Sequence, residues 1–193
     1  MDCPSLKSLS FPYPPAAHIG DCRFFVQLAT VTPERLPTNR TVVFRGFFPN
    51  TNQLQIITDS RSEKISHIET QPWGEICWYF IKTREQFRLA GKLTLITTDS
   101  DDETCQKERI TTWQNLSDSA RLQFAWPHPG KPREQNQAAF SAEVSANIPL
   151  PNFCLLLLDP EKVDHLELRG APQNRYLYTR KDSQTWLTQE VNP

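Results

Sequence analysis

The feature that most constrains the fold is a series of short β-rich runs, broken by prolines and polar residues, that begins at residue 24. Phe24–Val31, Thr38–Phe48 and Gln53–Asp59 are rich in β-branched and aromatic residues. The segments between them, Pro33–Pro37 and Pro49–Asn52, have the composition of turns. Short runs separated in this way predict antiparallel strands that follow one another as a meander.

The β-rich pattern is interrupted by one helical segment and then resumes. Ser62–Gln71 has Ile65 and Ile68 three residues apart, with Pro72 beyond its end, which predicts a short helix. Further strands are expected at Glu75–Ile81, Glu85–Thr97, Phe153–Leu158, Lys162–Arg169, Arg175–Arg180 and Thr185–Glu190.

The remaining segments are not strand-like. Asp99–Phe124 starts with acidic residues and is expected to form two helices, broken near Asn115–Ser117. Pro127–Pro151 is long, polar and rich in proline, and residues 1–20 form an irregular lead-in. We therefore expect one domain, residues 1–193, of the mainly β (α+β) class: a barrel of antiparallel strands with a few peripheral helices.

Composition excludes several classes of function. The net charge of −1 provides no basic field for nucleic acid or an anionic membrane, so a bound anion must be held by a local cluster. The longest apolar run, Leu155–Leu158, is too short to span a bilayer, and the first ten residues resemble no signal peptide. Together with the cysteines, which form no C-x-x-C motif, this predicts free thiols and a cytoplasmic location. The cysteines are Cys3, Cys22, Cys77, Cys105 and Cys154.

One group of residues could hold an anion. A hairpin between the second and third predicted strands would bring Arg40 and Arg45 near Arg61, Ser62 and Lys64, at the start of the short helix. Cations, a hydroxyl and free N–H groups form a phosphate site without a glycine-rich loop, and Asp59 or Ser60 could cap that helix. The alternative is a set of solvated surface charges. Residues five apart on a regular strand face opposite sides, so Arg40 and Arg45 share a ligand only if the strand bulges or the ligand is long.

Other candidate sites carry less information. Alternation places Gln86 and Arg88 on one face of their strand, where Gln86 could bind the edge of a heterocycle if that face lines a cavity. No recognisable turn presents a nucleophile. The four histidines show no metal-ligand spacing, so no metal is expected. They are His18, His67, His128 and His165.

The order of these motifs resembles one family, the pyridoxamine 5′-phosphate oxidase-related FMN-binding proteins, over roughly residues 25 to 180. The matching segments are Leu28–Val31, similar to the first barrel strand; Arg40–Arg45, similar to the R-x-V-L-L-K strand, with Arg45 in place of lysine; Thr58–Lys64, similar to the T-N-x-x-S-x-K loop; Arg84–Gln86 with Gly91, similar to the E-R-Q strand; and Asn174–Tyr178, similar to the D-R-F-L-Y segment.

The resemblance implies a split-barrel homodimer that binds FMN at its subunit interface, with a small-molecule substrate. It assigns Arg40, Ser62 and Lys64 to the FMN phosphate and Thr58 to a backbone contact with the cofactor, and the local chemistry adds Arg61. It places Arg45, Gln86 and Arg175 along the polar edge of the flavin ring, where the two arginines are candidates to tune the flavin. The full expected set is Arg40, Thr41, Val42, Val43, Arg45, Ile57, Thr58, Arg61, Ser62, Lys64, Gln86 and Arg175.

Two departures concern the substrate. The family's R-L-H-D-R pattern reads Ala171-Pro172-Gln173-Asn174-Arg175 here, so both substrate-binding groups are replaced. The arginine of its Y-x-x-x-R-x-x-x-S segment is also absent, and Arg121 or Lys131 are the candidates to replace it.

We therefore expect an FMN-dependent oxidoreductase that passes a hydride to flavin N5, with a substrate that need not be pyridoxamine 5′-phosphate. A non-catalytic flavin-binding protein for storage or sensing is the alternative, and the same barrel holding haem or a deazaflavin is a third.

Overall fold

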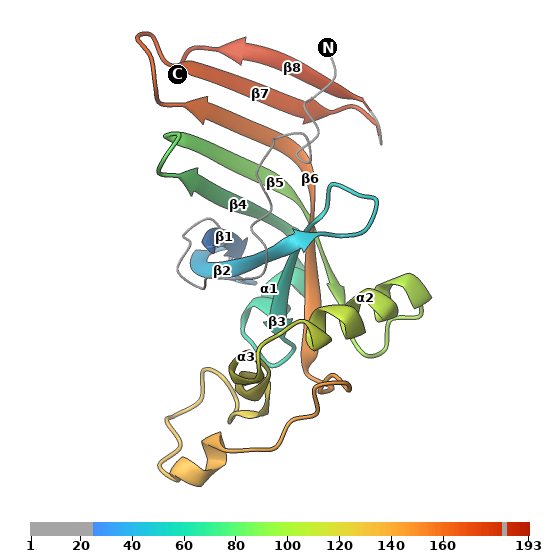
Figure 1. Cartoon of the computed structure of the whole chain (residues 1–193). Coiled ribbons are helices and arrows are strands. Elements are labelled where there is room, and N and C mark those ends of the chain that lie inside the picture. Colours follow the sequence, from blue (N-terminus) through green and yellow to red (C-terminus); the bar gives the residue numbers. More distant parts are fainter. Residues whose placement is uncertain (1–24, 183–184) are drawn as a thin grey trace.

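A computed structural model describes residues 25–182 and 185–193, and strands make up most of it (Figure 1). The expected lead-in, residues 1–20, lies outside the described residues. The strands are β1 (Phe25–Val31), β2 (Pro37–Phe47), β3 (Leu54–Asp59), β4 (Trp73–Phe80), β5 (Glu85–Ile96), β6 (Phe153–Glu167), β7 (Asn174–Arg180) and β8 (Trp186–Val191); the α-helices are α1 (Lys64–Thr70), α2 (Glu103–Gln114) and α3 (Asp118–Leu122).

The strands close into a six-stranded antiparallel barrel. The sheet order is β3-β2-β1-β4-β5-β6-β7-β8, and β3 also pairs with β6, which closes the ring. The first part of β6 pairs with β3, and its last part pairs with β7. β7 and β8 therefore continue the sheet beyond the barrel, as Figure 1 shows at its upper end. The predicted mainly β split barrel is confirmed.

Two apolar clusters lie on the two sides of the barrel wall. Inward residues such as Leu28, Ile56 and Leu89 fill the barrel interior. On the outside, Trp113 of α2 packs with Phe153 and other alternate residues of β6. The fully buried Trp113 fixes α2 against the wall through burial of a large apolar surface.

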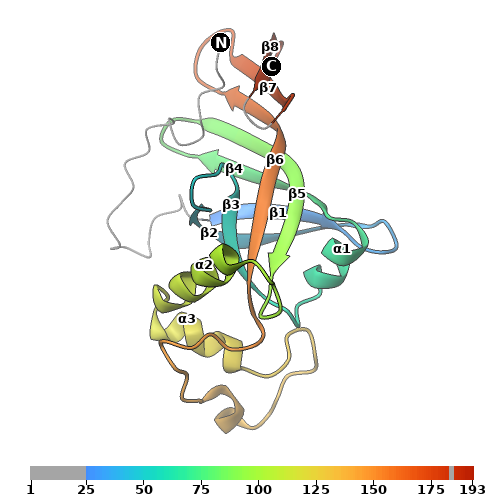
Figure 2. The same ribbon diagram turned by 90° about the vertical axis from the view of Figure 1, so that its right-hand side faces the viewer.

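The helices flank the barrel and do not enter it. Figure 2 shows α1 on one side, with α2 and α3 on the other. Beyond α3 the segment 127–151 extends away from the barrel and carries a short 3₁₀ helix, Gln137–Phe140. The predicted break between two helices near Asn115–Ser117 is confirmed, because α2 ends at Gln114 and α3 starts at Asp118.

Two local predictions were wrong. The two strands expected at 153–158 and 162–169 are the single strand β6. The register of β5 and β6 shifts at Pro160, which lies opposite Gly91. Because the hydrogen-bond ladder is irregular at this bulge, a proline without an N–H group is tolerated and β6 continues through it. The predicted cap of α1 by Asp59 or Ser60 is also wrong, since α1 starts at Lys64 with Glu63 as its N-cap and without a side-chain cap bond.

Two further observations concern the chain as a whole. Among the described cysteines, Cys77, Cys105 and Cys154 are free, while Cys3 and Cys22 lie outside the described residues. In the described part of the chain, none of the helices has the length and apolar character needed to cross a membrane.

Candidate functional site

A cluster of cations and hydroxyls forms where β3 leads into α1. The ammonium of Lys64 donates to Thr58 Oγ1 at 3.0 Å and to Ser62 Oγ at 2.9 Å. The two hydroxyl oxygens lie 3.3 Å apart. Thr58 is the last-but-one residue of β3, so the strand end and the turn after it fix these three groups in one place.

Arg40 on β2 is held rigidly by its neighbours. Its guanidinium donates to Thr30 Oγ1 at 2.7 Å, to Thr38 Oγ1 at 2.8 Å and to the carbonyl oxygen of Leu28 at 3.1 Å. Thr30 Oγ1 in turn lies 3.0 Å from Nδ1 of His67, a histidine of α1 that is only 1% exposed. Arg40 is thereby oriented before any ligand arrives, which lowers the entropy cost of binding one.

The electrostatics of the cluster favour an anion. Burial lowers the pKa of Lys64, and the neighbouring Arg40 guanidinium lowers it further. Burial also lowers the pKa of Arg40. Within residues 25–182 and 185–193, no ion pair joins either side chain to a carboxylate. The carboxylates of Asp59 and Glu63 raise the pKa of Lys64, and Glu63 raises that of Arg40, but neither forms an ion pair with these cations. A bound dianion such as a phosphate would offset the remaining cost of burying the two cations.

Arg61 is engaged elsewhere, although residue type and position grouped it with these cations. It forms a bidentate pair with Asp59, with Nη2 at 2.7 Å from Oδ2 and Nε at 3.0 Å from Oδ1. It also donates to the carbonyl oxygens of Phe124 and Trp126. Because these partners take four of its five N–H donors and Asp59 balances its charge, we leave Arg61 out of the proposed phosphate site.

A second row of candidate residues crosses β5, β6 and β7. Gln86 lies opposite Leu166, and Leu166 lies opposite Arg175. Directly opposite residues point to one face of a sheet, so Gln86 and Arg175 share a face. Arg175 is anchored there by Asp164, with contacts of 3.0 and 2.7 Å.

The two groups of candidates face opposite sides of the sheet. Arg40 lies opposite Leu28, and the register continues through Ile76 to Leu89, on the barrel interior. Gln86 precedes Leu89 by three residues on the same strand, so its side chain points outward. One chain therefore brings Arg40, Ser62 and Lys64 together and Gln86 and Arg175 together, but it does not join the two groups.

The sequence allows Arg40 and Arg45 to share a ligand only if β2 bulges or the ligand is long, and β2 does bulge. The β2–β3 register shifts between Phe44 and Gly46, so the bulge falls at Arg45. Arg45 is exposed, and Thr41 and Val43 precede it at alternate positions of the strand. Val42 and Ile57 are partly buried, Val42 against the cluster inside the barrel and Ile57 against the cluster outside it.

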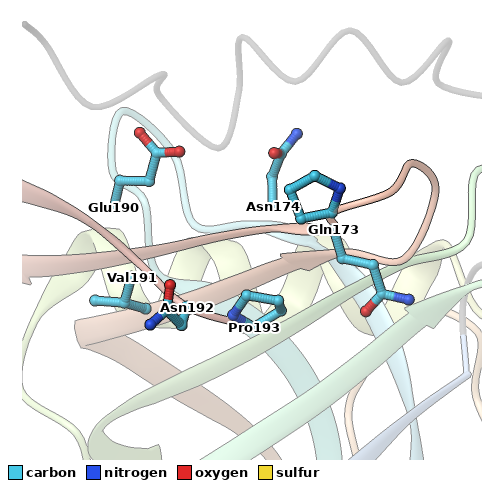
Figure 3. Close-up of a pocket in the computed structure, with 7 residues that line it drawn as sticks. Gln173, Asn174, Glu190, Val191, Asn192 and Pro193 are labelled. Carbon is cyan, nitrogen blue, oxygen red and sulfur yellow. The ribbon is translucent and has the colours of Figure 1, made fainter.

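The residues that replace the substrate-binding groups lie in the turn before β7. They are Ala171, which is exposed, and Gln173, whose amide donates to the carbonyl oxygen of Leu168 at 3.4 Å. Figure 3 shows the open hollow beside this turn, with Gln173 and Asn174 on one side and the chain from Glu190 to Pro193 on the other. The hollow belongs to the β7–β8 extension and not to the cation cluster.

Arg121, a candidate to replace the absent substrate arginine, is engaged at the end of α2. Its guanidinium donates to the carbonyl oxygens of Trp113, Gln114 and Leu116, and it pairs with Asp118. It is 6% exposed. It satisfies carbonyl groups that the helix end leaves open, which is a structural role. Lys131 is exposed, in the segment that leads away from the barrel.

Comparison with known proteins identifies the family. A family model described as the FMN-binding domain of pyridoxamine 5′-phosphate oxidase matches residues 19–97. The chain is 40% identical over 172 residues to pyridoxine/pyridoxamine 5′-phosphate oxidase 2 of Arabidopsis thaliana, covering 88% of this chain and 87% of that protein. The chain belongs to the pyridoxamine 5′-phosphate oxidase-related FMN-binding family.

Solved structures agree with this assignment. A pyridoxamine 5′-phosphate oxidase-related, FMN-binding protein from Nostoc punctiforme is 58% identical, with a TM-score of 0.85, over 91% of this chain and 90% of that one. PhzG from Burkholderia lata, solved with tetrahydrophenazine-1-carboxylic acid, superposes with a TM-score of 0.74 at 17% identity, over 90% of this chain and 84% of its own. At that identity PhzG shows the shared fold alone. The resemblance inferred from the motifs is thus confirmed at the level of the family.

Sequence reasoning missed the partners that position the site. Thr30, Thr38 and His67 orient Arg40, and Asp164 anchors Arg175. The sequence gives a weak indication of Thr30 and Thr38, because they are polar residues at inward positions of the two strands around Arg40. His67 and Asp164 come close only through the register of the strands and the packing of α1.

Proposed function

We propose that this chain binds FMN and acts as an FMN-dependent oxidoreductase in a homodimer. The observation that carries the proposal is the pair of half-buried cations, Arg40 and Lys64, which form no ion pair with a carboxylate of the described residues. Lys64 also donates to the hydroxyls of Thr58 and Ser62. That donor set fits a phosphate monoester. The description of the Nostoc punctiforme relative as FMN-binding supports FMN as the ligand that carries this phosphate.

The residues would divide the work of binding. Arg40 and Lys64 would donate charge-assisted hydrogen bonds to the phosphate, together with the hydroxyl of Ser62, while Thr58 keeps the Lys64 ammonium in place. FMN, when bound, supplies the two-electron chemistry, and the protein supplies orientation and charge. Arg45 and Arg175 carry positive charge suited to stabilising negative charge on a reduced ring.

The two faces of the sheet support the homodimer. The phosphate-binding group faces the barrel interior and its α1 end, while Gln86 and Arg175 face outward. A second subunit docked on the outer face would bring its own Gln86 and Arg175 toward a cofactor held by the first. The outer face carries exposed aromatic surface suited to burial, since Phe25 is 42% and Tyr79 41% exposed.

The substrate is a small molecule that reaches the flavin, and pyridoxamine 5′-phosphate is the first to test, because the Arabidopsis thaliana relative is named as an oxidase of that class. Ala171 and Gln173 offer no cation or imidazole for a phosphorylated substrate, and Arg121 is engaged by α2. These observations favour a different substrate, and they also favour the second candidate function, a flavin-binding protein without turnover.

The decisive experiment starts from purified protein. We expect the released cofactor to be FMN, at one per chain. Two results together support the enzyme: the photoreduced flavin reoxidises rapidly in air, and the oxidised protein turns over pyridoxamine 5′-phosphate or another amine or alcohol. FMN that is bound but inert toward dioxygen and every donor tried supports the storage or sensing protein. Purified protein that lacks a flavin and takes up no added FMN would remove both, and a Soret band instead would point to haem.

A further inference from the structure

A second group of ionisable side chains lies on the inward face of β5 and β6, near the start of β7. Glu85 and Glu167 lie directly opposite each other across these strands, and His165 precedes Glu167 by two residues on the same face. His165 Nε2 is 3.2 Å from a carboxylate oxygen of Glu85 and 4.0 Å from one of Glu167. One ligand atom from each of the three residues lies within 4.8 Å of the other two.

Among the described residues, no lysine or arginine forms an ion pair with the two carboxylates. Like charges placed directly opposite on neighbouring strands destabilise a sheet. In the described part of the chain, the ion pairs formed by Glu85 and Glu167 involve only His165 and no lysine or arginine. Two partly buried carboxylates beside one imidazole leave a local charge that a divalent cation would neutralise.

The surroundings already hold the three groups in position. The ring of His165 stacks on Phe87, with centroids 4.1 Å apart and planes at 10°, and His165 is 7% exposed. Asn174 donates to one oxygen of Glu167 at 2.9 Å, while the other oxygen is the one nearer to His165. Orienting contacts of this kind around the ligands are typical of metal sites.

We propose that Glu85, His165 and Glu167 form a binding site for a divalent transition-metal ion, with Zn²⁺ as the best match. One imidazole nitrogen and two carboxylate oxygens are common zinc ligands, at about 2.0–2.2 Å, and water would complete a tetrahedral set. Ligands of a tetrahedral zinc ion lie about 3.4 Å apart. The Glu85 oxygen, at 3.2 Å from Nε2 of His165, is already near that separation, while the Glu167 oxygen, at 4.0 Å, would have to move closer. Mg²⁺ and Ca²⁺, which prefer oxygen ligands alone, should bind much more weakly.

The position of the site gives it a structural consequence. Glu85, Glu167 and Asn174 each directly precede or follow a residue of the outward row, which contains Gln86, Leu166 and Arg175. A metal here would tie β5 to β6 at the point where the sheet leaves the barrel. No spacing along the chain signals such a site, because Glu85 and His165 are 80 residues apart.

The test is zinc binding by the protein as purified, with its cofactor, after dialysis against a chelator. We expect calorimetry to give one strong Zn²⁺ site per chain, a rise in Tm of about 5–10 °C at a hundredfold excess over Kd, and no matching response to Mg²⁺. Glu85→Gln and His165→Asn, which alter different strands, should each weaken zinc binding at least tenfold. Glu75→Gln, which alters a carboxylate on the outer face of β4, is the matched control and should leave zinc binding unchanged.

A crystal soaked in zinc locates the ion independently of any variant. Anomalous diffraction at the zinc edge should give a peak between the three side chains. The proposal is overturned if the wild-type protein binds no zinc, if the peak lies at the cysteines or elsewhere, or if both variants fold and bind zinc as the wild type does. If a variant fails to fold, the anomalous peak in the wild-type crystal decides.

Discussion

Replacing Lys64 by methionine tests how the cation cluster recognises its ligand. Methionine keeps most of the apolar stem and removes the charge. Lys64 Nζ uses two of its three donors on Thr58 and Ser62, which leaves one for a phosphate oxygen. A charge-assisted hydrogen bond is worth about 1.5–3 kcal/mol, so FMN affinity should fall by about 10- to 150-fold. The repulsion between Lys64 and Arg40 in the flavin-free protein is also removed. FMN binding no longer relieves this repulsion in the variant, so the repulsion contributes to the difference in affinity.

The assay is fluorescence titration of flavin-free protein with FMN and, in parallel, with riboflavin, which lacks the phosphate. Lys64→Met should weaken FMN binding and change riboflavin binding by less than about twofold, since only the phosphate contact is lost. Lys107→Met, which alters an exposed lysine of α2, is the control and should change neither. An equal loss for both flavins would mean that the substitution acts on the fold or the ring site, and no loss for FMN would refute the phosphate assignment.

Three further predictions concern the same structure. Because burial and Arg40 lower the pKa of Lys64 below 10.5, the unfolded chain binds more protons than the folded flavin-free protein at pH values between the two pKa values. The free energy of unfolding should therefore rise with pH across that window, and urea denaturation of Lys64→Met should show a smaller rise. A Cβ on Gly91 would overlap the carbonyl oxygen of Asp159, a backbone atom that cannot move aside. Gly91→Ala should lower the free energy of unfolding by about 3 kcal/mol or more, whereas Gly74→Ala, whose nearest contact is the flexible end of a leucine side chain, should cost less in the same assay. Sedimentation of the flavin-loaded protein should report a dimer, and a stable monomer with a full complement of FMN would contradict the shared site.

The strands were predictable because their signal is local. The alternation of buried and exposed residues in β5, from Phe87 through Leu89, Gly91 and Leu93, is visible in the sequence and matches its inward face. Residues that belong to one turn were also predictable: Thr58, Ser62 and Lys64 meet because the chain between them is short. Such features need no knowledge of the rest of the fold.

Features that depend on long-range pairing were not predictable. Asp159-Pro160-Glu161 looks like a break between strands, and only the shifted register against Gly91 explains why β6 continues through it. The contacts of Arg61 depend on such pairing too. Residue type groups it with the cations, whereas in the fold Asp59 and the carbonyl groups of residues 124 and 126 hold its guanidinium. Competition between partners decides where a long side chain lies, and a sequence does not display that competition.

The family resemblance contributed the cofactor, which the residues alone left as an unnamed anion. The residues in turn limit what the resemblance implies about the substrate, because Ala171 and Gln173 occupy the positions of the family's substrate-binding groups. The two lines of reasoning therefore support the flavin more strongly than they support any one substrate.

The phosphate site is tested most sharply by comparing the affinities of the wild-type, flavin-free protein for FMN and riboflavin. If Arg40, Ser62 and Lys64 bind the phosphate, FMN should bind at one per chain and at least about 100-fold more tightly than riboflavin, since two charged contacts are gained. Equal affinities for the two flavins, or no uptake of FMN, would contradict the assignment of these three residues.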